Sequence, residues 1–206
     1  MLTLAVALTA ALQQAPERFP AAPQQDARRY ALDLKVDLDA KRLRGSVDYT
    51  FTARAPLTYI RLDAKRSDDW QVRFTTTDGA PIEAKWSDEH VDVPVAGGAV
   101  EGEDVRFRAE LAGVPVDGFY FKENRYDEPM AFTDHYSIRA RGWLPCEDHP
   151  SDRAVFETVL QYASDQEAVA FGLSKGVRGP AEKGYVTQRF VGKSEIPPYM
   201  LSLIHI

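Results

Sequence analysis

The sequence predicts an all-β fold, either a twisted antiparallel sheet or a β-sandwich. Apolar and polar residues alternate with a period of two in several segments, and turn residues separate these segments. No segment carries a long apolar stripe with the helical period of 3.6 residues. The chain has 206 residues, of which 44% are hydrophobic and 27% are charged. This composition is typical of a globular protein and excludes a disordered chain.

The first two strands are expected to form an antiparallel hairpin. Residues 30–38 are apolar at every second position, with polar residues between them, and residues 43–53 resume the same alternation. The polar residues 39–42 supply the connection, and Gly45 predicts a β-bulge in the second strand.

Shorter strands are expected along the rest of the chain, and the Asp78-Gly79 pair predicts a turn between two of them. Many short strands separated by turn residues are typical of a sandwich or a large antiparallel sheet. The segments that carry this pattern are 59–63, 70–75, 82–86, 91–95, 105–111, 154–162, 168–174 and 185–191.

The N-terminus has the pattern of an export signal. Residues 1–11 contain a short apolar run with small residues near its end, which predicts a cleaved signal peptide, although a positively charged start is missing. An N-terminal helix, or a signal truncated at its upstream end, is the alternative. Residues 12–27 are rich in Pro, Ala and Gln and predict a spacer. We therefore expect a periplasmic or secreted protein, and no later segment is apolar enough for a membrane span.

Charge and cysteine content exclude several classes of function. Lys and Arg number 25 against 31 Asp and Glu, so the net charge is −6 and a nucleic-acid partner is not expected. A single cysteine excludes an internal disulfide framework and a metal site built from several thiolates.

No catalytic motif emerges from the residues alone. No two histidines lie three or four residues apart, and there is no Gly-x-Ser-x-Gly segment. In Asp134-His135, neighbouring side chains on a strand would point to opposite faces, so a catalytic dyad is not expected there. Glu147-Asp148 is interpreted as an acidic loop rather than a glycosidase pair, and Cys146 as a buried, inert thiol.

Residues 141–154, RGWLPCEDHPSDRA, carry the most specific pattern in the chain. This segment resembles the Arg-x-[aromatic]-x-Pro-Cys-x-Asp-x-Pro-x-x-[Lys/Arg]-Ala signature of the aminopeptidase N family of zinc metallopeptidases, the gluzincins. Further matches follow in the family's order, and together they place the resemblance over residues 28–200. They lie at 30–34, 45–47, 62–64, 118–121 and 197–200.

The resemblance implies the saddle-like N-terminal β domain of such an enzyme. In the family this domain caps a thermolysin-like catalytic domain, which carries the His-Glu-x-x-His zinc motif and the Gly-x-Met-Glu-Asn loop. Neither motif occurs in this sequence. The resemblance therefore implies the substrate-side domain of a zinc aminopeptidase that acts on peptides, with the zinc and the C-terminal catalytic domain outside this chain. The chain alone is then expected to be inactive. The alternative is a non-catalytic β scaffold or protein-binding module of the same fold.

The resemblance also implies two substrate-binding residues. The family has a Thr-Gln-x-[Gln/Glu] segment that holds the amino end of the substrate, and residues 133–136 here read TDHY. Asp134 stands where Gln is usual, and its carboxylate suits a substrate ammonium. Tyr136 takes the second position and offers a hydroxyl without charge. The alternative is that Asp134 is a structural acid at a strand end.

The last six residues, 201–206, read LSLIHI. They resemble the translation of a transposon sequencing adapter, so we expect a non-native tail. A genuine final strand is the alternative.

Overall fold

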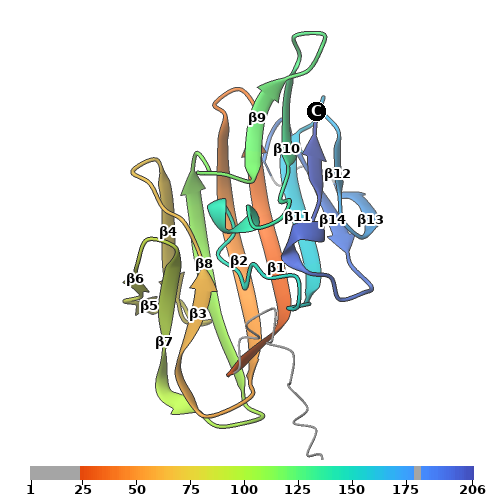
Figure 1. The fold of residues 1–206 in the computed structure, drawn as a ribbon. Coiled ribbons are helices and arrows are strands. Elements are labelled where there is room, and N and C mark those ends of the chain that lie inside the picture. The colour runs from red at the N-terminus through yellow and green to blue at the C-terminus, as the bar shows by residue number, and fades with distance from the viewer. Residues whose placement is uncertain (1–23, 179–181) are drawn as a thin grey trace, which may run out of the picture.

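The computed structural model describes residues 24–178 and 182–206. Its regular structure consists of fifteen strands in three sheets and two single-turn 3-10 helices, with no α-helix in the described part (Figure 1). The predicted all-β class is confirmed. The predicted signal peptide (1–11) and residues 12–23 of the predicted spacer lie outside the described residues.

An eight-stranded sheet forms the body of the domain. Its strands lie side by side in the order β13-β14-β11-β1-β2-β8-β4-β5. They are β1 (Gln25–Asp37), β2 (Arg42–Ala53), β4 (Trp70–Thr75), β5 (Pro81–Ile82), β8 (Asp104–Gly113), β11 (Val155–Ala163), β13 (Leu173–Arg178) and β14 (Tyr185–Val191).

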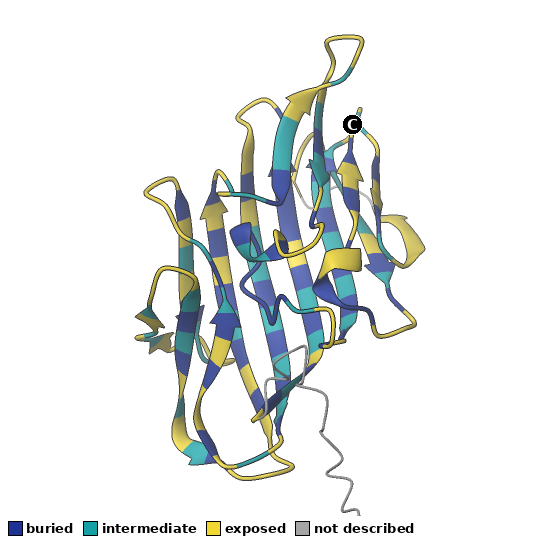
Figure 2. Ribbon diagram, in the orientation of Figure 1, coloured by how far each residue is buried: buried dark blue, intermediate teal, exposed yellow. Residues whose placement is uncertain are grey.

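Two smaller sheets and the two 3-10 turns complete the fold, and buried residues from all three sheets form one core (Figure 2). The three-stranded sheet contains β3 (Leu57–Asp63), β7 (His90–Ala99) and β6 (Lys85–Trp86). The four-stranded sheet contains β12 (Ala168–Ala170), β15 (Leu203–His205), β10 (Pro129–Thr133) and β9 (Phe119–Glu123). The turns are η1 (Ala140–Gly142) and η2 (Pro198–Met200).

A row of aromatic rings on the buried face sets the register of the central strands. Tyr30 lies directly opposite Tyr49 on β2 and Phe156 on β11, and Tyr49 lies opposite Phe107 on β8. The rings of Tyr30 and Phe156 stack with centroids 4.9 Å apart, and those of Tyr49 and Phe107 stack at 4.8 Å. Each such pair adds about 0.5–1.5 kcal/mol beyond the burial of its area. A slip by one residue would move every ring to the solvent face.

One strand pair departs from the antiparallel prediction. β1 and β2 form the predicted antiparallel hairpin, but β1 pairs with β11 in parallel, so the large sheet is mixed. A parallel pair needs a crossover connection, and here the chain from 38 to 154 supplies it by way of both smaller sheets. Local alternation carries no information on such a distant pairing.

Two predicted strands are each split between sheets. The segment 82–86 divides because Ile82 pairs with Phe74 in the large sheet, whereas Trp86 pairs with Val91 in the three-stranded sheet. The segment 168–174 divides at Gly172, whose φ of +107° turns the chain from β12 into β13. Strand β1 also begins at Gln25, so the predicted spacer ends earlier than residue 27.

Strands β9, β10 and β15 were not among the strand segments predicted by alternation. β15 includes residues 203–205 of the predicted tail and pairs with β10 and β12. The non-native origin of residues 201–206 stays a prediction.

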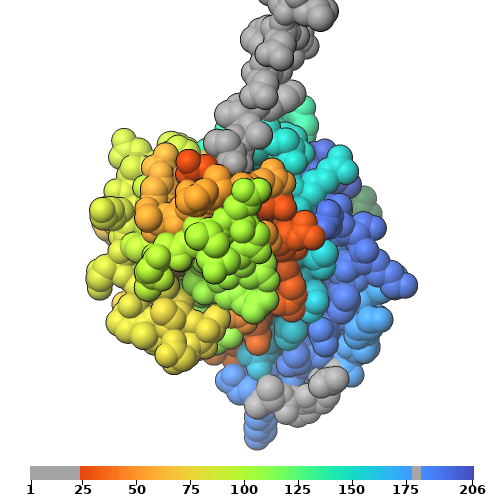
Figure 3. Space-filling model, turned by 90° about the horizontal axis from the view of Figure 1, so that it is seen from below, coloured from red at the N-terminus to blue at the C-terminus, as the bar shows by residue number. Residues whose placement is uncertain are grey.

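The lower end of the domain is closed by backbone hydrogen bonds between distant segments. Ala53 at the end of β2 donates to Glu103 (2.8 Å) and accepts from Gly102 (2.8 Å), and Arg54 donates to Gln24 (2.9 Å). Figure 3 shows the β7–β8 turn, in green, against the β2–β3 connection and the start of β1. These bonds satisfy the backbone groups where the hairpins end.

The bulge predicted at Gly45 is wrong, because the β1–β2 register runs through it without a shift. The glycine is needed for a different reason. A Cβ at Gly45 would lie 2.0 Å from the carbonyl oxygen of Asp33 on β1. The only shift in this pair comes between Ala27 and Arg29.

We predict that Gly45→Ala lowers the free energy of unfolding by about 2–4 kcal/mol, because backbone on two central strands must move apart. Gly79→Ala is the matched control, since Gly79 also has a positive φ (+92°) but nothing lies within 4 Å of a Cβ there. It should cost about 1–2 kcal/mol. Urea denaturation followed by fluorescence measures both, and equal losses would contradict the steric explanation.

Candidate functional site

The two predicted substrate-binding residues lie together in the loop that joins β10 to η1. The side chain of Asp134 is 50% exposed, and Tyr136 is 82% exposed. Both side chains are therefore accessible to a ligand, and their role in substrate binding stays a prediction.

Asp134 is fixed through its backbone and only partly through its carboxylate. Its N–H donates to the carbonyl oxygen of Gly118 (3.0 Å), which ties the loop to the start of β9. Arg139 Nη1 lies 3.2 Å from Asp134 Oδ2. Oδ1 has only a 3.4 Å contact from the backbone N–H of Tyr136. One carboxylate oxygen is thus held by a cation and the other is nearly free.

His135 points the opposite way and anchors the loop to the core. Trp143 Nε1 donates to His135 Nε2 (2.8 Å), so Nδ1 carries the ring proton and donates to the carbonyl oxygen of Pro198 (3.2 Å). Burial lowers the pKa of His135 to about 4, so the ring is neutral at physiological pH. Asp134 and His135 lie in the loop after β10 rather than on a strand, with the Asp134 side chain exposed and the His135 ring buried.

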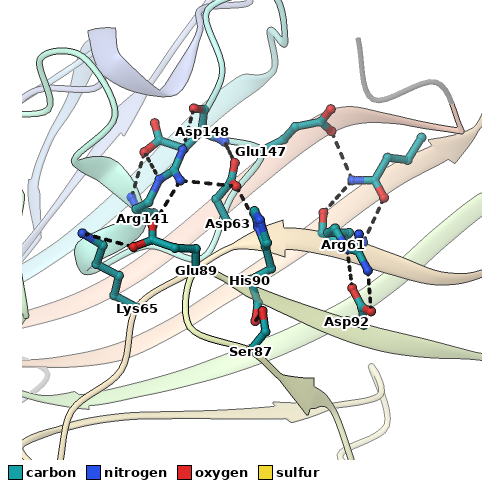
Figure 4. Close-up of polar contacts among 11 residues, drawn as sticks. Arg61, Asp63, Lys65, Ser87, Glu89, His90, Asp92, Arg141, Glu147 and Asp148 are labelled. Atoms are coloured by element: carbon teal, nitrogen blue, oxygen red, sulfur yellow. Dashed lines mark hydrogen bonds and ion pairs between the residues drawn. The ribbon is translucent and has the colours of Figure 1, made fainter. Parts of the chain in front are cut away.

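Arg141 and Asp148 of the 141–154 signature belong to a charge network with Asp63, Glu89 and His90 (Figure 4), in which Asp148 is buried and Glu89 is half exposed. Arg141 Nε donates to Asp148 Oδ2 (3.1 Å), and the Arg141 backbone N–H donates to the same oxygen (3.2 Å). Arg141 Nη1 also lies 3.6 Å from Asp63 and 3.4 Å from Glu89. Asp63 accepts from the Asp148 backbone N–H (2.9 Å). His90 Nδ1 lies 3.0 Å from Asp63 Oδ1. The guanidinium therefore gathers acids from three separate segments.

Cys146 is a buried member of this region. It exchanges two backbone hydrogen bonds with Asp63, at 2.8 and 3.1 Å. Burial raises the pKa of its thiol well above the ordinary value, so the reactive thiolate does not form. The predicted burial of Cys146 is confirmed, and its lack of reactivity stays a prediction.

Two further carboxyl groups, those of Glu147 and Asp152, are buried close to the start of β1. Gln25 Nε2 donates to Glu147 Oε2 (3.2 Å) and to the carbonyl oxygen of Arg61 (2.7 Å). Burial, with the Asp152 charge as a second cause, raises the pKa of Glu147 to about 8. Burial also raises the pKa of Asp152 to about 7. Sequence reasoning missed Asp152, because nothing in the local sequence marks it as buried.

The donor set in residues 24–178 and 182–206 does not fit a zinc ion. No cluster of three His, Cys, Asp or Glu side chains is placed there to hold a metal. Both ring nitrogens of His135 have hydrogen-bond partners, and the Cys146 thiol keeps its proton. A zinc ion would need ligands from outside these residues. In the same part of the chain, no helix has the length and apolar character to cross a membrane.

The all-β fold agrees with the N-terminal β domain that the resemblance implies. The model of the family described as the Peptidase M1 N-terminal domain matches residues 26–200. The chain belongs to this family, and the resemblance to aminopeptidase N enzymes is confirmed.

Curated relatives are aminopeptidases. Aminopeptidase M1-D of Oryza sativa subsp. japonica is 31% identical over 151 residues, which cover 69% of this chain and 17% of the relative. Leucine aminopeptidase 2 of Chaetomium globosum is 27% identical over 194 residues, which cover 83% of this chain and 29% of the relative. The chain therefore spans less than a third of the length of these relatives.

Solved structures agree with the fold. The M1 zinc metallopeptidase from Deinococcus radiodurans superposes with a TM-score of 0.73 at 27% identity, covering 88% of this chain and 42% of that one. A two-domain M1 zinc metallopeptidase mutant bound to L-tryptophan gives the same values.

The buried carboxyl groups predict that stability falls as pH rises. Glu147 and Asp152 have raised pKa values in the folded state, so their protonated forms stabilise the fold fully below about pH 4. This stability is lost as pH rises through about 7 and about 8.

Glu147→Gln, which stays neutral, should raise the free energy of unfolding at pH 8 by about 1–3 kcal/mol and change it little at pH 5. Urea titrations across this range measure it; an equal effect at both pH values would contradict the assignment.

Proposed function

We propose that this chain is the N-terminal, substrate-side domain of a zinc-dependent aminopeptidase that removes N-terminal residues from peptides, and that Asp134 binds the peptide's amino end. Family membership and the names of the relatives support the peptidase parent. Structures of M1 zinc metallopeptidase mutants have been determined with L-arginine and with a Tyr-Ser-Ala substrate.

The observation that carries the proposal is the state of the Asp134 carboxylate. It is half exposed on a loop whose backbone is fixed to β9, and its Oδ1 is nearly free to accept a ligand. A peptide ammonium is a cationic donor that suits this acceptor, and a charge-assisted hydrogen bond contributes about 1–3 kcal/mol. The neighbouring Tyr136 offers a hydroxyl to the same ligand.

In this proposal the metal and the reacting groups come from outside the chain, from a C-terminal catalytic domain. The chain's own task is to hold the amino end and so fix which peptide bond meets the reactive centre. The Pro/Ala/Gln-rich segment and apolar N-terminus support export to the periplasm or the exterior. The alternative is a non-catalytic scaffold of the same fold without zinc ligands. An intact His-Glu-x-x-His motif in the downstream sequence would favour the aminopeptidase over the scaffold.

We predict that Asp134→Asn in the full-length enzyme raises KM for peptides with a free amino end about 5- to 150-fold, because a neutral amide replaces the carboxylate opposite the ammonium. Inhibition constants of N-acetylated peptides, which lack that charge, should stay within about twofold.

Asp127→Asn is the matched control, since Asp127 is an exposed acid at the tip of the β9–β10 hairpin. It should leave both constants unchanged. Equal losses for free and acetylated peptides would show that Asp134 is a structural acid, and the proposed role would be abandoned.

We also predict that the purified 206-residue chain binds no stoichiometric zinc and hydrolyses no aminoacyl substrate, because its described donors do not fit a metal. Metal analysis after dialysis against zinc measures the first part, and a fluorogenic aminoacyl substrate the second. One tightly bound zinc ion per chain would contradict this prediction.

A further inference from the structure

Four polar side chains form a continuous chain of contacts that ends at Asp134. The hydroxyl of Tyr120, on β9, donates to Asp117 Oδ1. Arg139 Nη1 donates to the same hydroxyl oxygen (3.3 Å) and to Asp134 Oδ2 (3.2 Å). Sequence reasoning missed Arg139 and Tyr120, because 19 residues separate them in the chain.

Hydrogen bonds and close packing fix the backbone of the residues that carry these four side chains. Asp117 Oδ1 accepts from the N–H of Gly118 (2.9 Å), and Arg139 donates its N–H to His135 (3.2 Å). Gly118 has a φ of +75°, and a Cβ there would lie 2.1 Å from the Arg139 carbonyl oxygen. The backbone of Gly118 is therefore packed directly against the backbone of Arg139.

These partners orient the Arg139 guanidinium. Burial and the hydrogen bond to Asp117 raise the pKa of Tyr120, so its hydroxyl keeps its proton and directs it at Asp117. The lone pairs of the hydroxyl are then free to accept from Arg139. An isolated surface ion pair is mobile and contributes little, but a guanidinium that also donates to a hydroxyl held in place has fewer orientations.

We infer that Arg139, held by Tyr120 and Asp117, is a positioning residue that binds Asp134 Oδ2 and leaves Oδ1 as the acceptor for the amino end of a peptide. This inference rests on the proposed function of Asp134. It assigns the chain's peptide specificity to a hydrogen-bonded group of four residues, rather than to one carboxylate.

A positioning role and a structural role of Arg139 predict different effects: the first changes peptide binding, and the second changes the stability of the fold. The side chains of Arg139 and Asp134 are 46% and 50% exposed, so loss of their contact costs the fold little. The effect should instead appear in the binding of free-amine peptides.

Three variants of the full-length enzyme test the inference. Tyr120→Phe removes one hydroxyl and should raise KM for free-amine peptides about three- to tenfold, with kcat nearly unchanged. Arg139→Gln should raise KM at least as much. Arg139→Lys keeps the charge but loses the fork of donors, so it should restore part of the affinity.

The hairpin tip offers a matched control pair. Arg125 donates to the hydroxyl of Tyr126, and its guanidinium lies 4.5 Å from the ring centroid, but both residues are at the far end of the β9–β10 hairpin. Tyr126→Phe and Arg125→Gln make the same chemical changes and should leave KM and kcat unchanged.

The double variant Tyr120→Phe/Asp134→Asn separates this inference from the proposed function. If Asp134→Asn alone leaves KM unchanged, the proposed function fails. If Asp134→Asn raises KM, and Tyr120→Phe raises KM in the wild-type background but no further in the Asp134→Asn background, both stand. If Asp134→Asn raises KM but Tyr120→Phe and Arg139→Gln have no effect in the wild-type background, or their effects are independent of Asp134, the positioning role is overturned.

Discussion

The contact between Asp63 and Cys146 joins the three-stranded sheet to the segment that leads into the large sheet. Asp63 ends β3 in the three-stranded sheet, and Cys146 follows η1 on the way to β11 in the large sheet. Two backbone hydrogen bonds join them, and the Asp63 carboxylate accepts a third bond from the Asp148 N–H. Arg141 then supplies the positive charge that offsets the burial of Asp148. A buried carboxylate without a partner would destabilise the fold by roughly 3–5 kcal/mol.

This contact explains in physical terms why the 141–154 segment carries the most specific pattern in the sequence. Arg141 provides a planar fork of donors for two acids, Cys146 fits a fully buried position, and the Pro145 carbonyl accepts from the hydroxyl of Tyr49 (2.9 Å). Each residue type meets a requirement of packing or charge. The residues proposed to bind peptide lie just before this segment, on the exposed loop.

Sequence reasoning was sufficient wherever one strand has a buried and a solvated face. The alternation in β1 and β2 predicted their hairpin, because most buried residues there follow the two-residue period; Lys35, which is also buried, and the shift between Ala27 and Arg29 are the exceptions. β9 was missed because Phe119, Tyr120 and Phe121 are consecutive aromatic residues that hide the alternation. The parallel β1–β11 pair and the contact between Arg139 and Tyr120 join residues far apart in the chain, so no local pattern could predict them. Asp134 and Tyr136 were found only through the family resemblance, and their role stays a prediction.

In the loop that carries Asp134, the groups that fix the backbone are different from the side chains that are proposed to bind peptide. Its fixed points are the His135 ring, which lies between Trp143 and Pro198, and the Asp134 backbone N–H, which donates to Gly118. Neither depends on the Asp134 or Tyr136 side chains, which are turned to solvent. A change of residue type at these two positions therefore costs the fold little. This explains how the chain can have Asp and Tyr where the aminopeptidase N pattern has amide or acidic residues, and keep the family's fold.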